Sequence, residues 1–198
     1  MKSVLISIQP KWVEKICHEI GKENGKPIYE KVVEVRKTRP KIETPFKCYI
    51  YATWNGSKKE ILVKQDGRLF CEDWRKASGL QRASGKVIGE FVCDSIIDIP
   101  FKKHFLYYGK KMFHSNNCCK EACLSYIELE DYLGNKDGYG WHISDLKIYD
   151  KPKELREFWT IKCTNKRNGC QDCKVKPSCI KTITRPPQSW CYVESLGE

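Results

Sequence analysis

Four cysteines near the C-terminus of the 198-residue chain have the spacing of a metal site. The sequence there reads C-x6-C-x2-C-x5-C, formed by Cys163, Cys170, Cys173 and Cys179. Four thiolates arranged as a tetrahedron suit a structural Zn²⁺. The segment around them has almost no apolar residues, so it cannot build a core of its own, and a bound metal would explain why it folds. We predict a zinc knuckle, with disulfides, a redox pair, an iron–sulfur cluster or disorder as the alternatives.

The remaining cysteines and one histidine divide into two groups. A second set of ligand types, with the less regular spacing H-x3-C-C-x3-C, leaves a second metal site open: His114, Cys118, Cys119 and Cys123. Five further cysteines lie in apolar or strand-like contexts, and we predict that they are core thiols: Cys17, Cys48, Cys71, Cys93 and Cys191.

The segment 31–37, KVVEVRK, predicts a β-branched strand with two different faces. Because alternate side chains of a strand share a face, Val33 and Val35 should enter the core while Glu34 and Arg36 project together from the opposite side. A carboxylate accepts from exocyclic amines and a guanidinium offers a planar fork of donors, so this pair has the chemistry to bind a base edge. The alternative is a surface ion pair worth about 0–1 kcal/mol.

Cations and aromatic rings are interleaved around this strand. The basic residues near it are Lys11, Lys31, Lys37, Arg39 and Lys41, and the rings are Trp12, Tyr51 and Trp54. Lysines that contact phosphate and rings that stack on bases would serve an unpaired nucleotide, although core packing is the alternative for each ring. The net charge of +11 favours a polyanionic partner, with simple solubility as the alternative.

Short strands dominate the elements that must position these residues. We predict strands over residues 4–8, 31–37, 47–53, 86–99, 141–149 and 189–194, and a hairpin over 61–70 that turns at Asp66-Gly67. Helices are expected from Pro10 to near Gly21, from Ser125 with Glu128 at capping-box spacing, and briefly after Pro152, with a loop over 21–27. Many short strands with few helices indicate an α+β fold with a mixed or antiparallel barrel.

The cellular compartment is predicted from what the sequence lacks. No apolar run approaches the roughly 20 residues that span a bilayer, and the N-terminus has no signal-peptide pattern. We therefore expect a cytoplasmic protein with no membrane partner. In a reducing compartment, cysteines serve as core thiols or metal ligands more often than as disulfides.

Six segments, in order from about Ser3 to Glu194, resemble the ASCH family of the PUA-like superfamily. They are ISIQPKWVEKI, VVEVRKTRP, KCYIYAT, GKVIGEF, YGWHISDLKIYDKPKEL and PPQSWCYVE. The resemblance implies one ASCH domain over residues 1–198, folded as a PUA-like mixed β-barrel with short flanking helices and a cleft beside the first helix. The zinc knuckle would then be an insertion at about 160–185, before the closing strand.

The resemblance also implies a function, the binding of RNA or a modified nucleobase in a basic cleft. The residues that we expect there are Lys11, Trp12, Lys31, Glu34, Arg36, Lys37 and Arg39. Some ASCH proteins are amidohydrolases that act on acetylated cytidine, or ribonucleases, so the catalytic candidates are Lys31, Glu34 and Glu128. Glu34 stands where the amidohydrolases have threonine, and Glu128 also fits a helix cap. A hydrolase and a protein-interaction scaffold remain the alternatives.

Overall fold

The computed structural model describes residues 2–54, 60–100, 115–134, 136–161 and 179–194. Its helices are α1 (Pro10–Cys17), α3 (Ser115–Glu121) and α4 (Tyr126–Leu133), with a 3-10 turn η1 (Leu155–Glu157). The main sheet has the order β12 (Ser144–Lys153), β9 (Val87–Cys93), β5 (Phe46–Ala52), β1 (Lys2–Ile8) and β15 (Trp190–Glu194). Two smaller sheets of the described residues have three strands each. One has the order β10 (Ile96–Ile99), β11 (Gly138–His142) and β4 (Val33–Arg36), and the other has the order β7 (Arg68–Asp73), β6 (Glu60–Gln65) and β8 (Gln81–Arg82). Two further sheets have two strands each, β2 (Glu19–Glu23) with β3 (Lys26–Tyr29), and β13 (Trp159–Ile161) with β14 (Ile180–Thr182).

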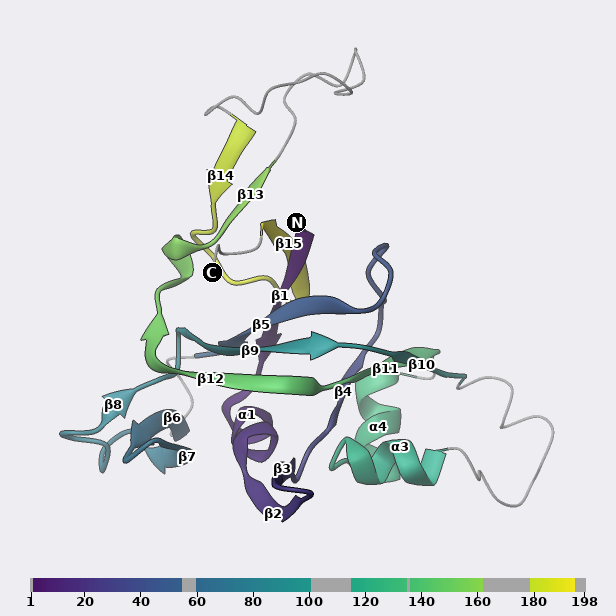
Figure 1. The fold of residues 1–198 in the computed structure, drawn as a ribbon, viewed down its shortest axis with the longest axis horizontal. Coiled ribbons are helices and arrows are strands. Elements are labelled where there is room, and N and C mark those ends of the chain that lie inside the picture. The colour runs from purple at the N-terminus through teal and green to yellow at the C-terminus, as the bar shows by residue number, and fades with distance from the viewer. Residues whose placement is uncertain (1, 55–59, 101–114, 135, 162–178, 195–198) are drawn as a thin grey trace.

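The main sheet is mixed, as predicted, but it does not close. Strand β1 runs parallel to β5 and antiparallel to β15, and the other pairs are antiparallel. The predicted barrel requires hydrogen bonds that join the two edge strands. Within the described residues, the strands form five separate sheets, and β12 and β15 remain edges of the largest one. The α+β class is therefore confirmed, whereas the closed barrel is not found (Figure 1).

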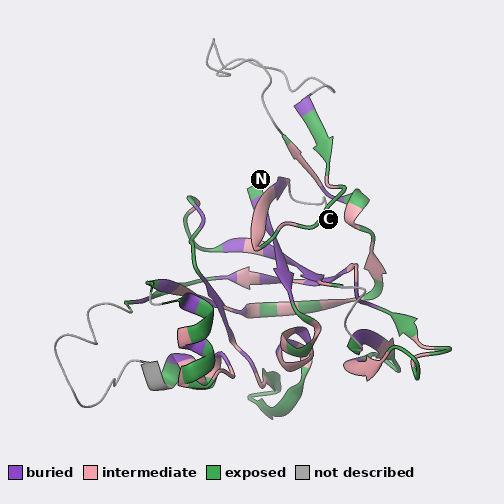
Figure 2. Cartoon of the chain, turned by 180° about the vertical axis from the view of Figure 1, so that it is seen from behind, coloured by how far each residue is buried: buried purple, intermediate pink, exposed green. Residues whose placement is uncertain are grey.

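Strand β1 is buried from its second residue onward because it is covered on both faces. Val4, Ile6 and Ile8 belong to one buried cluster, which also contains Trp141, and Leu5 belongs to a second cluster on the opposite face. Figure 2 shows the buried β1 at the centre of the molecule and the exposed β2–β3 hairpin at its margin. A strand that is buried on both faces loses the polar–apolar alternation of a half-exposed strand.

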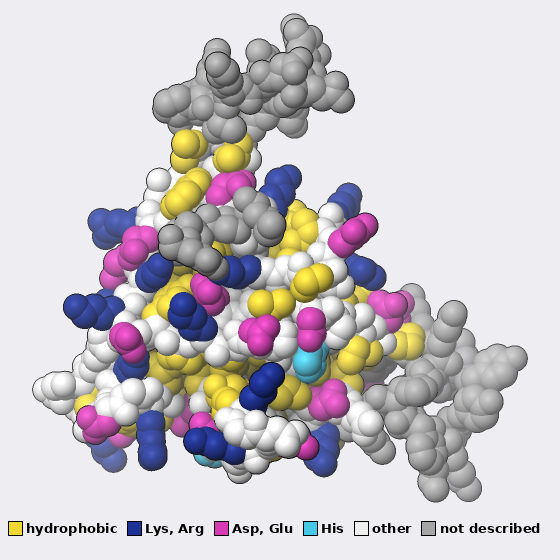
Figure 3. All heavy atoms as spheres, in the orientation of Figure 1, with side chains coloured by type: hydrophobic (Ala, Val, Ile, Leu, Met, Phe, Trp, Pro, Cys, Tyr) yellow, Lys and Arg dark blue, Asp and Glu magenta, His cyan; other side chains and the backbone are white. Residues whose placement is uncertain are grey.

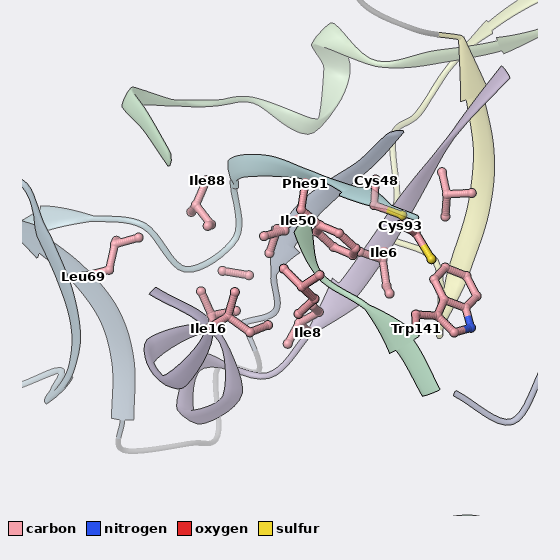
Figure 4. Close-up of a cluster of buried hydrophobic side chains, with 14 of the residues drawn as sticks. Ile6, Ile8, Ile16, Cys48, Ile50, Leu69, Ile88, Phe91, Cys93 and Trp141 are labelled. Carbon is pink, nitrogen blue, oxygen red and sulfur yellow. The ribbon is translucent and has the colours of Figure 1, made fainter. Parts of the chain in front are cut away.

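Two of the predicted core thiols point into the first of these clusters. Figure 4 shows Cys48 and Cys93 beside Phe91 and Trp141. Burial raises the pKa of the Cys93 thiol to about 12 and that of Cys48 well above its usual value. The other three predicted core thiols, Cys17, Cys71 and Cys191, are half-buried and pack against the clusters. The prediction of core thiols is confirmed for Cys48 and Cys93, and the other three lie at the edge of the core.

The first helix is shorter than predicted. It ends at Cys17, and the chain continues into the β2–β3 hairpin where we expected the end of the helix and a loop. Asn24 and Gly25 form the turn, with φ of 49° and 78°. An Asn-Gly pair with both φ angles positive is the preferred two-residue hairpin turn, so the sequence carried this signal. Ile20, within the range predicted to be helical, lies exposed on β2.

Two predicted strands are each divided between two sheets. Residues 86–99 form β9 and β10, and residues 141–149 fall in β11 and β12. The β5–β9 register shifts next to Gly89. A Cβ atom on Gly89 would lie 2.5 Å from the carbonyl oxygen of Lys147, so only glycine allows this close approach. Pro152 lies near the end of β12, and the brief helix expected after it is the turn η1.

Three other local predictions are confirmed. The hairpin β6–β7 turns at Asp66-Gly67, the capping box of Ser125 opens α4, and the closing strand is β15.

The β13–β14 pair, in which Ile161 lies opposite Ile180, brackets the cysteine-rich segment and extends away from the main sheet (Figure 1). Of the four predicted zinc ligands, Cys179 is buried, whereas Cys163, Cys170 and Cys173 lie outside the described residues.

Candidate functional site

A pocket of about 510 Å³ lies beside α1, and residues of β4 and α4 also line it. A volume of this size is within the usual range for small-molecule sites, roughly 300–1,000 Å³. Six predicted residues line the pocket: Lys11, Trp12, Lys31, Glu34, Arg36 and Glu128. The fold therefore brings together residues that are separated by more than a hundred positions in the chain.

Strand β4 presents its two faces as predicted. Val33 and Val35 pack into a buried cluster with residues of α3 and α4. Glu34 and Arg36, on the other face, line the pocket, and each residue is only 6% exposed. The pair is therefore not the surface ion pair that was the alternative. Its electrostatic interactions occur in a site largely removed from water, where they are stronger.

The carboxylate of Glu34 lies between two cations. Arg36 Nη2 is 2.9 Å from Glu34 Oε1, and Lys31 Nζ is 3.3 Å from Glu34 Oε2. Arg36 Nη2 also donates to the carbonyl oxygen of Ser7, at 2.8 Å. This last bond ties β4 to β1, which belongs to a different sheet. The Glu34–Arg36 orientation is thus set by the packing of the two sheets.

Lys31 is 2% exposed, and three acceptors surround its ammonium group. Nζ donates to the carbonyl oxygens of Val33 and Ala122, both at 2.7 Å, and it pairs with Glu34. An ammonium group has three N–H donors. The two hydrogen bonds to backbone carbonyls link β4 to the end of α3. The catalytic role of Lys31 stays a prediction.

Buried polar atoms of the same cluster are left without hydrogen bonds. Among the described residues, Glu34 Oε2 and Arg36 Nε have no hydrogen-bond partner, and neither does Trp141 Nε1, which β11 places opposite Glu34. The contact of Lys31 Nζ with Oε2 is an ion pair without hydrogen-bond geometry. Buried polar groups are nearly always satisfied, so the two orphaned atoms of Glu34 and Arg36, which line the pocket, indicate a polar ligand or ordered water.

Aromatic rings enter the pocket from two helices. Trp12 of α1 makes cation–π contacts with two lysines. Lys11 Nζ lies 4.2 Å and Lys31 Nζ lies 5.4 Å from its ring centroid. Tyr132 of α4 makes a cation–π contact with Lys37, whose Nζ lies 5.3 Å from the ring centroid. Burial raises the pKa of Tyr132, and the nearby guanidinium of Arg36 opposes that shift. Each ring is therefore held under a cation while it lines the pocket.

Tyr132 was not predicted from the sequence, although a signal was present. It follows Glu128 by four positions, and residues i and i+4 of a helix lie on the same face. Once Glu128 was placed at a cleft, Tyr132 had to lie beside it. Glu60 and Asp131 were also missed, and both line the pocket.

Glu128 forms the predicted cap. Its backbone N–H donates to Ser125 Oγ at 3.2 Å, and its Oε2 accepts from the Ser125 backbone at 2.9 Å. The hydrogen bonds that the Ser125 backbone N–H and the Ser125 hydroxyl donate to the Glu128 carboxylate lower the pKa of Glu128, which favours the carboxylate. Its place on the pocket wall is compatible with ligand contact, and its catalytic role stays a prediction.

Positive charge does not dominate the pocket lining. Three cationic residues, Lys11, Lys31 and Arg36, are matched by acidic residues that include Glu60 and Asp131. The predicted contacts Lys37 and Arg39 are exposed and do not line the pocket. On the face in Figure 3, basic and acidic side chains are interspersed. The expectation of a basic cleft is therefore corrected to a pocket of mixed charge with cations outside it.

The second cysteine group does not form a metal centre in the described part of the chain. Cys118 belongs to the buried cluster beside β4, where burial raises its pKa to about 11. Cys123 Sγ donates to the carbonyl oxygen of Glu30, at 3.1 Å. His114 lies outside the described residues, and no group of three or more ligating side chains occurs among those that are described.

Comparison with known proteins identifies the fold. No protein-family model matches the sequence, and no curated protein matches it either. The structure is similar to that of ASCH from Zymomonas mobilis, with 18% identity, a TM-score of 0.49, and coverage of 97% of this chain and 87% of that one. A mutant of the same protein gives 18% identity and a TM-score of 0.50, with coverage of 98% and 91%. The chain therefore has the predicted ASCH fold. None of the helices in the described segments has the length and apolar character of a membrane span.

Proposed function

We propose that this protein binds nucleic acid, and RNA in particular, by receiving one base in the pocket beside α1. The observation that carries the proposal is the buried Glu34–Arg36 pair. Both residues line the pocket, and each retains a buried polar atom without a hydrogen-bond partner among the described residues. A base edge that presents a donor beside an acceptor would complement a carboxylate and a guanidinium held side by side.

The other walls of the pocket suit an uncharged, flat ligand. Trp12 and Tyr132 supply rings on which a base can stack. A lining of mixed charge gives no strong preference for an anion, so a neutral base fits it better than a phosphate group does. Lys37, Arg39 and Lys41 are exposed, and we assign the contacts with the sugar–phosphate backbone to them.

Binding to nucleosides and to single-stranded RNA tests this proposal. We expect the chain to bind both, and only the affinity for RNA should fall steeply with salt, because only RNA releases counterions from its backbone. Trp12→Ala should weaken both ligands, since a stacked base contributes roughly 1–3 kcal/mol. Isothermal titration over a range of salt concentrations measures both effects. Absence of binding to either ligand would refute the proposal and favour the interaction scaffold.

Zinc remains part of the proposal through Cys163, Cys170, Cys173 and Cys179. Cys179 is buried just before β14, and the β13–β14 pair brings the two ends of the cysteine-rich segment together. We expect purified protein to hold an equimolar amount of zinc, and Cys170→Ser to abolish it, since a structural site uses all four thiolates. Elemental analysis measures the metal, and Cys48→Ser is the control, because Cys48 is a core thiol. Zinc content that Cys170→Ser leaves unchanged would contradict the assignment.

A further inference from the structure

An exposed tryptophan follows a pocket-lining residue in the chain. Thr53 lines the pocket, and its backbone N–H donates to the carbonyl oxygen of Ile8, at 2.8 Å. The next residue, Trp54, is 51% exposed, although large aromatic side chains are more often buried. Consecutive Cα atoms are about 3.8 Å apart, so the backbone of Trp54 lies next to that of a residue that lines the pocket.

A cation covers one face of this tryptophan. The guanidinium carbon of Arg82, on β8, is 3.9 Å from the centroid of the Trp54 ring. Arg82 Nε also donates to the carbonyl oxygen of Ser84, at 3.2 Å, and Gly85 N donates to the carbonyl oxygen of Ala52, at 2.8 Å. These backbone hydrogen bonds hold the segments that carry Trp54 and Arg82 next to each other, and about half of the tryptophan surface remains exposed.

We propose that Trp54 and Arg82 form a second stacking site, which holds the base next to the one in the pocket. An exposed indole backed by a guanidinium offers a base a flat surface, and the cation adds attraction for the neighbouring phosphate. Because the two sites adjoin, neighbouring nucleotides of one strand can occupy both. The inference rests on the proposed function, and it identifies the full ligand as a single-stranded segment of at least two nucleotides, of which a free nucleoside would fill only the pocket.

Binding measurements with two ligands separate this inference from the proposed function. The probes are a free nucleoside and an unstructured RNA of about eight nucleotides, which is within the site size of single-strand-binding domains. Trp54→Ala should weaken the RNA roughly tenfold, as expected for one lost stacked base, and should leave the nucleoside affinity unchanged. Arg82→Gln should act in the same direction, and Trp54→Phe should retain most of the affinity.

Ile97→Ala is the control, because it removes another exposed apolar side chain, from β10, and it should change neither affinity. If Trp54→Ala leaves RNA binding intact while Trp12→Ala weakens both ligands, the second site is refuted and the pocket stands. Equal losses for the nucleoside and the RNA with Trp54→Ala would also refute it, because Trp54 would then support the pocket itself. If the wild-type chain binds neither ligand, the proposed function fails first.

Discussion

Replacing Glu34 with glutamine should cost about 3–5 kcal/mol of unfolding free energy, because it leaves buried cations without their counter-charge. Glu34 is 6% exposed and contacts both Lys31 and Arg36. Glutamine has nearly the same shape, so the loss would come from charge and not from a cavity. Urea denaturation followed by tryptophan fluorescence measures the change.

The matched control for this substitution is Glu154→Gln. Glu154 pairs with Lys86 at 3.1 Å, but both side chains are more than a third exposed, so the change should cost less than about 1 kcal/mol. In a double-mutant cycle, Lys31→Met combined with Glu34→Gln should cost less than the sum of the single changes, because one of the orphaned cations is also removed. Additive costs, or a loss from Glu34→Gln as small as that from Glu154→Gln, would show that the buried pair is not coupled.

Arg36→Lys should lower the affinity for the bound base by roughly ten- to a hundredfold, which corresponds to the loss of a hydrogen bond from a charged donor. Lysine keeps the positive charge beside Glu34, so the buried ion pair survives. It lacks the planar fork and the Nε–H group that is left without a partner in the described structure. Titration with a nucleoside isolates this effect from contacts with the phosphate backbone.

Arg39→Lys is the matched control, since it makes the same substitution at an exposed residue that does not line the pocket. It should change the nucleoside affinity little. Equal losses for the two variants would mean that the guanidinium of Arg36 has no special role. The thermal midpoint of Arg36→Lys, measured in parallel, distinguishes a weakened site from a destabilised fold, because a fully folded variant with reduced affinity points to the site alone.

Several local features could be predicted from the sequence because short-range chemistry determines them. The turn at Asp66-Gly67 requires positive φ at both residues, and the capping box of α4 requires only Ser125 and Glu128. The alternation in β4 follows from the geometry of a single strand. The Asn24-Gly25 hairpin belongs to the same class, and it was missed because the helix was extended to near Gly21 and the following residues were assigned to a loop.

Other features could not be predicted, because they depend on which strands become neighbours. Residues 86–99 read as one strand, yet β9 and β10 pair in different sheets. No local pattern states whether a sheet closes, since closure depends on the registers of strands that are distant in sequence. The charge of the pocket has the same origin, because Glu60 and Asp131 reach it from separate elements.

The sequence alone determined the chemical types of the site: an ionic pair on one face of a strand, a tryptophan in the first turn of a helix, and thiols suited to zinc. These depend on residue identity and on periods of two or four positions along one element. Only the tertiary structure decided that Glu34 and Arg36 are buried beside a pocket, with Lys31 bonded to the end of α3. Burial and hydrogen-bond satisfaction depend on atoms supplied by distant segments, and here those atoms come from β1, α3 and α4.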